Sequence, residues 1–269
     1  MNSSTEKSPL QPPAPKDSPK AKMMTWAAVR HAVPFGLWLG IMLLAHLMHL
    51  TESSGSDDVG SLNLISDANL YALRTVLCAL ALLVLRPWKY YSALKTKNIL
   101  PAIGIGTGIF FLWIGFETQF VKQLFPEVSK LYEMWLVKPF GELRAPMESV
   151  SQYDPSLCGW PLTIVRLAGS AFVISVIEEF FWRGYLLRTV RTPDFLDVDI
   201  GEFHLPSFLV VAAVFAIEHV EVGAGFVTGL VYGWFYIKTK DIWAASIAHI
   251  VTNLLLGINV IAAGNWQYW

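Results

Sequence analysis

The feature that most limits how this chain can fold is a succession of long apolar segments. A helix that crosses a lipid bilayer needs about 20 consecutive, mostly apolar residues. Seven segments approach this length, at about 31–50, 66–85, 99–120, 161–183, 206–222, 222–238 and 242–262. Because backbone groups inside a bilayer must satisfy their own hydrogen bonds, such segments fold as helices. The sequence therefore predicts an all-α, polytopic helical membrane protein with about seven to eight transmembrane helices.

Two of these segments, 206–222 and 222–238, are short and closely joined, so we expect one or both to be tilted or partly re-entrant. The stretch "SKLYEMWLVKPFGEL" is amphipathic and too charged to span, and it is expected to lie along the membrane interface. The composition agrees with a membrane protein, since 54% of the residues are hydrophobic and 15% are charged. The sequence has no basic patch, so we expect the lipid bilayer and no nucleic acid as its surroundings.

The chain divides into three parts by composition. Residues 1–25 are rich in Ser, Pro and Lys at their start and are predicted to be a disordered tail. Residues 26–158 hold the N-terminal transmembrane helices and an outer loop, and residues 159–264 hold the remaining membrane helices. Only the last part carries an unusual set of polar residues, which makes it the candidate for function.

Basic residues between the apolar segments predict the orientation in the membrane. Cytoplasmic loops of membrane proteins carry an excess of Lys and Arg. Here basic residues gather before the first segment, between the second and third, after the fourth and after the sixth, for example Lys22, Lys89, Arg191 and Lys240. The sequence thus predicts a multi-pass protein of the cell inner or plasma membrane, with a cytoplasmic N-terminus and an outer C-terminus.

Ionisable and amide side chains interrupt three of the apolar segments. The fourth contains Glu178, Glu179 and Arg183, the fifth contains His219, and the seventh contains His249 and Asn253. Such side chains are rare inside membranes, usually face the bundle interior, and are candidates for function by default. Any one of them alone could serve as a structural contact between helices, but the whole combination is hard to explain by packing.

The spacing of these residues separates the two carboxylates. Residues four apart share a helix face, so Glu179 and Arg183 are expected to pair. Glu178 is rotated by about 100° from its neighbour and points elsewhere. The same spacing places His249 above Asn253, and it stacks Phe215 one turn from His219.

The polar stretches of the fourth, fifth and seventh apolar segments resemble the motifs of one family of intramembrane proteases. It is the CAAX protease and bacteriocin-processing family, also called the CPBP or Abi family. "EEFFWRG" resembles its Glu-Glu-x-x-x-Arg motif, "FAIEH" its Phe-x-x-x-His motif, and "HIVTN" its His-x-x-x-Asn/Asp motif. The resemblance covers roughly residues 160–260 and implies a CAAX prenyl protease-related hydrolase. A bacterial branch associated with exosortase systems is similar in its many-span layout.

The resemblance implies proteolysis of a membrane-embedded or membrane-anchored protein or peptide substrate. By similarity, Glu178 and His219 activate a water molecule, while His249 and Asn253 hold the oxyanion. Glu179, Arg183 and Phe215 then support the catalytic residues. These roles fit the residue types, because a glutamate suits general acid–base work and imidazole and amide groups can donate to an oxyanion.

Two alternatives remain open from the sequence. Glu178, His219 and His249 form a His₂Glu set of the kind that holds catalytic zinc, although no His-Glu-x-x-His helix is present. The metal-free glutamate mechanism, without a cofactor, is the favoured expectation. The same polar residues could also serve a non-hydrolytic membrane protein for immunity or transport.

Overall fold

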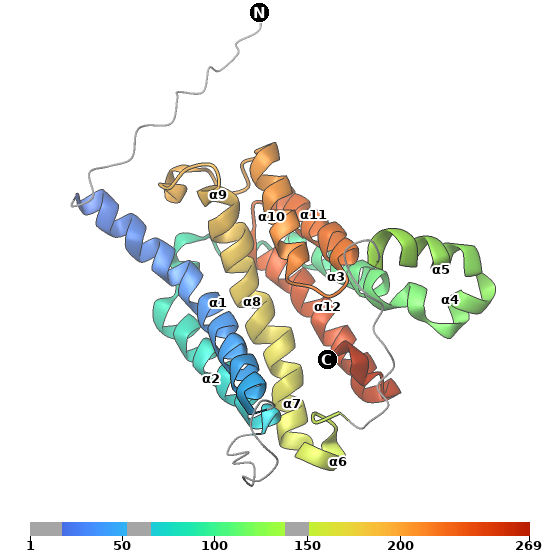
Figure 1. Ribbon diagram of the computed structural model, residues 1–269. Coiled ribbons are helices and arrows are strands. Elements are labelled where there is room, and N and C mark those ends of the chain that lie inside the picture. The colour runs from blue at the N-terminus through green and yellow to red at the C-terminus, as the bar shows by residue number, and fades with distance from the viewer. Residues whose placement is uncertain (1–17, 53–65, 138–150) are drawn as a thin grey trace, which may run out of the picture.

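The structure is a computed structural model that describes residues 18–52, 66–137 and 151–269. Within these ranges the chain forms helices joined by turns and has no strand, which confirms the predicted all-α, polytopic class (Figure 1). Five helices are long and apolar enough to cross a membrane. They are α1 (Pro19–Glu52), α2 (Asp67–Leu85), α3 (Ile99–Ile114), the continuous α7–α8–α9 helix (Trp160–Thr189) and α12 (Ile242–Ala263).

The two short predicted spans form a helical hairpin. Helix α10 (Leu205–Ile217) has 13 residues, which at 1.5 Å per residue gives about 20 Å, less than the hydrocarbon core of a bilayer. Helix α11 (Val222–Thr239) returns along it. Gly225, Gly229 and Gly233 of α11 face α10, and a Cβ added to Gly229 would lie 3.0 Å from the Cα atom of Ala212. The hairpin therefore depends on a small-residue face.

The first helix begins earlier than the predicted end of the tail. Helix α1 starts at Pro19, so residues 19–25 are helical, and residues 1–17 lie outside the described part of the chain. Proline is favoured in the first turn of a helix, and the following "KAKMM" consists of good helix formers. These local preferences outweigh the polar composition that suggested disorder.

Short helices extend sideways from the bundle after α3. They are α4 (Gln119–Leu124), α5 (Pro126–Tyr132) and a π-helical segment (Glu133–Val137), and Figure 1 shows α4 and α5 standing away from the other helices. Large apolar side chains such as Phe120 and Trp135 are exposed on them. This surface suits the predicted interfacial position, although residues 138–143 of the predicted element lie outside the described residues.

The bundle packs most closely where α3 crosses α12. A Cβ atom added to Gly106 of α3 would overlap the carbonyl oxygen of Ala248, so only glycine allows the two backbones to approach this far. The Thr252 hydroxyl donates a hydrogen bond to the Gly106 carbonyl at 2.7 Å. This contact ties a helix of the N-terminal part to the helix that carries His249 and Asn253.

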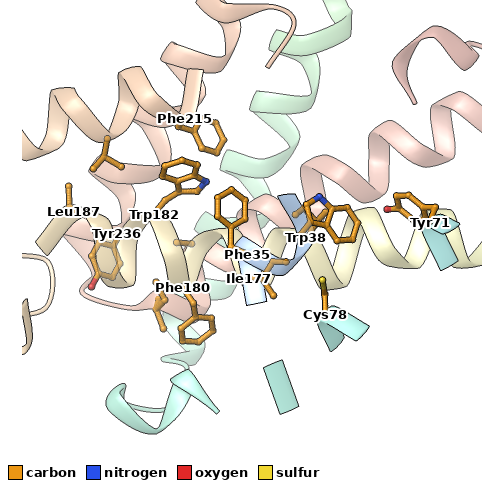
Figure 2. Close-up of a cluster of buried hydrophobic side chains, with 14 residues drawn as sticks. Phe35, Trp38, Tyr71, Cys78, Ile177, Phe180, Trp182, Leu187, Phe215 and Tyr236 are labelled. Carbon is orange, nitrogen blue, oxygen red and sulfur yellow. The ribbon is translucent and has the colours of Figure 1, made fainter. Parts of the chain in front are cut away.

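The largest apolar core surrounds the helix that carries the two glutamates. Phe35 and Trp38 of α1, Phe180 and Trp182 of the long helix, and Phe215 of α10 belong to it (Figure 2). Around α8 (Ser175–Glu179) the long helix has π-helical segments, Gly169–Ile174 before it and Phe180–Leu186 after it. Such π-turns are frequent at functional sites, because they change which side chains share a face.

Candidate active site

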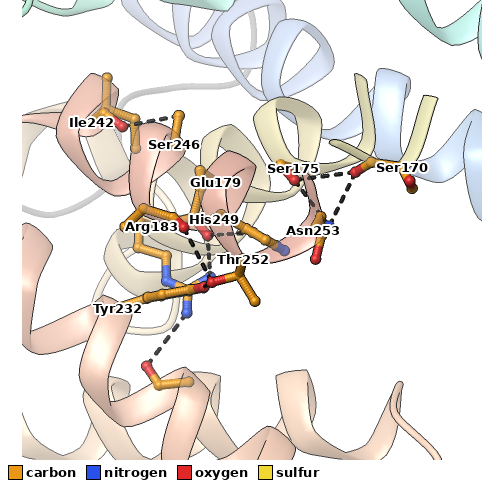
Figure 3. A network of polar contacts seen from close by, with 12 residues as sticks. Ser170, Ser175, Glu179, Arg183, Tyr232, Ile242, Ser246, His249, Thr252 and Asn253 are labelled. Atoms are coloured by element: carbon orange, nitrogen blue, oxygen red, sulfur yellow. Dashed lines mark hydrogen bonds and ion pairs between the residues drawn. The ribbon is translucent and has the colours of Figure 1, made fainter. Parts of the chain in front are cut away.

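A buried network joins α8 and the following π-segment to α12. The Arg183 Nη1 donates to Glu179 Oε1 at 2.9 Å, and the same oxygen lies 3.0 Å from Nδ1 of His249 (Figure 3). Glu179 and Arg183 are 0% and 1% exposed. One carboxylate oxygen thus accepts from two cationic or polar donors on different helices, as a buried charge requires.

The arginine of this network also reaches the α10–α11 hairpin. Its Nη2 donates to the Gly229 carbonyl at 3.4 Å, and its guanidinium carbon lies 4.8 Å from the ring centre of Phe215. Because Gly229 and Phe215 belong to α11 and α10, Arg183 holds the hairpin against the long helix. Phe215 therefore touches the network on one side and the His219 ring on the other, with 4.6 Å between the two ring centres.

Both candidate histidines are oriented through Nδ1. His219 lies just after α10, and its Nδ1 is 2.7 Å from the Phe215 carbonyl oxygen. His249 has its Nδ1 against the Glu179 carboxylate. Since a carbonyl and a carboxylate only accept, each Nδ1 carries the hydrogen, and in a neutral ring the lone pair is on Nε2.

Asn253 is held by the long helix rather than by His249. Its Nδ2 donates to the Ser170 carbonyl and to the Ser175 hydroxyl, each at 3.0 Å (Figure 3). The Ser175 hydroxyl donates in turn to the Ser170 carbonyl at 3.2 Å. Both amide hydrogens of Asn253 are therefore bound by residues of the long helix that precede the glutamates, Ser170 and Ser175.

Glu178 lies next to the network but is not part of it. Its side chain is 6% exposed, and its buried Oε2 forms no hydrogen bond of normal geometry among the described residues, although it interacts with the Trp182 indole, whose Nε1 also lacks a partner. Its charge interacts with those of Glu218, Glu179 and Arg183. A buried carboxylate oxygen without a partner is costly, so it calls for a functional explanation.

A cavity of about 230 Å³ brings the histidines and Asn253 together. Its polar wall near the network is formed by His219, Thr228, Tyr232, His249, Thr252 and Asn253. Phe215 also lines it, whereas Glu178 is not among the lining residues. The structure thus places three of the four predicted catalytic residues on one cavity and leaves Glu178 buried beside it.

The sequence model of the family described as "type II CAAX prenyl endopeptidase Rce1-like" matches residues 160–255. Residues 160–255 are therefore similar to the CAAX protease family. All seven motif residues lie inside the matched range, which confirms the resemblance shown by their spacing. Comparison with curated proteins gives no match, and comparison with solved structures gives none either.

Several residues of this candidate site lack a clear sequence signal. The Tyr232 hydroxyl is 2.7 Å from the Thr252 hydroxyl, and the Tyr232 ring lies 5.2 Å from the His249 ring. Both residues look like ordinary helix positions in the sequence. Glu218 precedes His219, and only the fold shows that it approaches Glu178.

The zinc alternative requires three ligands that gather at one point. Among the described residues, no group of three or more His, Cys, Asp or Glu side chains is arranged to hold a metal ion. The proposed set of Glu178, His219 and His249 is therefore not drawn together in this conformation. Instead, His249 turns its Nδ1 toward Glu179.

Proposed function

We propose that the chain is a membrane endopeptidase that hydrolyses a peptide bond of a membrane-embedded or membrane-anchored substrate. The family of CAAX endopeptidases implies this activity for residues 160–255. The observation that carries the proposal is the cavity shared by His219, His249 and Asn253, with His249 oriented by the buried Glu179–Arg183 pair. An imidazole set by a carboxylate against a cavity is a recurrent arrangement for moving protons.

In the proposed reaction, Glu178 and His219 activate water. The buried carboxylate of Glu178 is the proton acceptor, and the basic Nε2 of His219 polarises the same water molecule. The hydroxide oxygen attacks the peptide carbonyl, the proton moves to the leaving amine, and the carbon–nitrogen bond breaks. Water is the nucleophile, so no acyl-enzyme forms.

His249 and Asn253 are the proposed oxyanion residues. A protonated His249 carries a second N–H on Nε2, and the Glu179 carboxylate stabilises the positive charge of the ring. Asn253 would exchange its hydrogen bond to Ser175 for one to the oxyanion, while Ser175 keeps its bond to the Ser170 carbonyl. Donors that are positioned before the reaction stabilise the developing charge most strongly.

The proposed orientation has the N-terminus in the cytoplasm and the cavity open to the opposite side. The α10–α11 hairpin begins and ends at the same face whether or not it crosses, so five or seven crossings give the same outcome. The cavity is lined by Tyr71, Trp113 and Trp269, near the ends of α2 and α3 and after α12. Those positions lie away from the loops that carry Lys and Arg.

The test compares wild-type protein with Glu178→Gln in liposomes that contain a library of lipid-anchored and single-span peptides. The wild type should generate new peptide termini, and in H₂¹⁸O each new carboxylate should contain ¹⁸O. Glu178→Gln should lower the rate by at least about 100-fold, the usual contribution of a general base, without changing thermal stability. Glu127→Gln, on the exposed surface of α5, is the matched control. Unchanged cleavage by Glu178→Gln would contradict the proposal.

A further inference from the structure

His219 lies in the turn between α10 and α11, which covers residues 218–221. A side chain in a turn is not held by a regular helix, so its direction depends on the groups around it. Catalytic side chains must keep their direction closely, and neighbouring residues supply that restraint. The contact between the His219 Nδ1 and the Phe215 carbonyl oxygen is one such restraint.

A second restraint on His219 is the indole of Trp113, which belongs to α3. The two ring centres lie 5.3 Å apart, with 44° between the ring planes, which is within the usual range for aromatic pairs. Trp113 is 6% exposed, and it lines the cavity of about 230 Å³ together with His219. The indole therefore limits the space into which the imidazole can turn.

A hydrogen bond fixes the indole itself. The Trp113 Nε1 donates to the Thr228 hydroxyl oxygen at 3.0 Å, and that hydroxyl donates to the Ala224 carbonyl at 2.8 Å. A ring that served only to fill apolar space would not need this bond, and phenylalanine could not form it. Because Thr228 belongs to α11, the indole connects α3 with the helix that follows His219.

Helix α3 is in turn fixed against the helix that carries the second candidate histidine. Gly106 meets the backbone of Ala248, and its carbonyl accepts a hydrogen bond from the Thr252 hydroxyl at 2.7 Å. His249 lies between these two residues of α12. Trp113 follows Gly106 by seven residues, which is about 10 Å along the helix. One helix thus contacts the surroundings of both histidines and can set their relative position.

We propose that Trp113 is a positioning residue for His219, and that Thr228 acts through it by holding the indole N–H. The inference rests on the proposed function, in which His219 polarises the attacking water. It gives α3, which precedes the matched residues 160–255, a part in the active site. A misplacement of about 1 Å can lower an enzymatic rate by about 100-fold. Changes at Trp113 should therefore lower kcat more than they change KM.

The kinetic test uses the same cleavage assay in liposomes. Trp113→Leu removes the ring and should lower kcat by about 10–100-fold, with KM changed less than about three-fold. Trp113→Phe keeps an aromatic ring without the N–H, so it should retain more of kcat than Trp113→Leu. Trp234→Leu changes a tryptophan of α11 that is 51% exposed, and as the matched control it should cleave like the wild type.

Thr228→Val tests the hydrogen bond, because it removes the acceptor while keeping the size of the side chain. It should lower kcat by about as much as Trp113→Phe. If Thr228 acts through the indole, adding Thr228→Val to Trp113→Phe should cause no further loss, since both changes remove one shared interaction. Additive losses in the double variant would contradict the proposed role of Thr228.

A spectroscopic measurement follows the imidazole without any cleavage. In protein labelled with ¹⁵N-histidine and purified in detergent, the His219 signals are assigned by their loss in His219→Asn. Above neutral pH the wild type should show one tautomer with its hydrogen on Nδ1, as the contact with the Phe215 carbonyl requires. Trp113→Leu should move these signals toward a mixture of both tautomers, and Trp234→Leu should leave them unchanged.

Three results would overturn the proposal. They are a wild-type kcat in Trp113→Leu, tautomer signals that this variant leaves unchanged, and a raised KM with unchanged kcat, which would make Trp113 a substrate contact. If thermal unfolding shows that Trp113→Leu does not fold, Trp113→Phe and Thr228→Val decide in its place. Signals of His219 that depend on Trp113 in a wild type that cleaves nothing would end the proposed function and leave the positioning standing.

Discussion

One long helix, Trp160–Thr189, carries three arginines, and two of them, Arg166 and Arg183, lie in opposite circumstances. Arg183 bonds to Glu179 at 2.9 Å and belongs to a buried network that includes His249. Arg166 lies against aromatic rings and forms no ion pair within the described ranges. The role of a charged residue in a membrane helix therefore depends on its partners. The carboxylate of Glu179 makes Arg183 part of a link between helices, whereas an arginine without such a partner needs other acceptors, as Arg188 has in the carbonyl oxygens of Leu196 and Val198.

The largest expected effect comes from breaking the ion pair between Glu179 and Arg183. Glu179→Gln removes the carboxylate that binds Arg183 and His249, leaving a buried cation without its partner, which costs about 3–5 kcal/mol. Thermal unfolding in detergent, followed by circular dichroism, should show a strongly lowered midpoint. Arg166→Gln should change that midpoint little, because no ion pair is lost.

A double variant tests whether the unpaired cation causes the loss of stability. The double variant Glu179→Gln, Arg183→Met removes the cation along with its partner and should recover part of the lost stability, since a buried pair can be replaced by apolar groups. If Glu179→Gln and Arg166→Gln destabilise the protein equally, the contrast between the two ends of the helix is wrong.

The next effect concerns Asn253. If its amide donates to the oxyanion, Asn253→Ala should lower the cleavage rate by about 100–1,000-fold, the usual effect of removing one such donor. Ser175→Ala removes only the hydroxyl that Asn253 contacts in the present conformation, and it should cost far less. The measurement is the rate on the same peptide substrate, with binding checked by calorimetry. Equal losses in both variants would show that Asn253 positions the π-helical segment instead of holding the oxyanion.

Much of the fold follows from the sequence because membrane helices obey strong local rules. Length and apolarity identified the five helices that can span, and the i, i+4 spacing placed Glu179 beside Arg183. The Gly106–Ala248 crossing and the cavity shared by His219 and His249 depend on helices far apart in the sequence. No local pattern contains that information, since Gly106 looks like an ordinary glycine of an apolar helix.

The directions of the side chains within the site could not be predicted from the sequence either. Two π-helical segments alter the rotation of side chains along the long helix, so a regular 3.6-residue period does not give their directions. The spacing placed Asn253 below His249, but the structure shows its amide bound to Ser170 and Ser175. Such contacts depend on how the helices pack, which the sequence of one helix does not specify.

Metal removal is expected to have the smallest effect on the cleavage rate. His249 directs its Nδ1 to Glu179. Among the described residues, no three candidate ligands lie close enough together to hold a metal ion. An amide such as Asn253 is a poor zinc ligand compared with His, Cys or carboxylate. A glutamate and a histidine can activate water together. We therefore expect dialysis against a strong chelator to leave the cleavage rate unchanged.

This expectation needs activity and metal content to be measured on the same sample of purified protein in detergent. Retained cleavage with far less than one zinc ion per chain would support the glutamate mechanism. Cleavage that disappears and returns with stoichiometric zinc, but not with calcium, would make Glu178, His219 and His249 ligands, and it would require these side chains to move together. In that case the Glu179–His249 contact becomes the interaction that orients a ligand. The buried pair of Glu179 and Arg183 would then support metal binding instead of the oxyanion site.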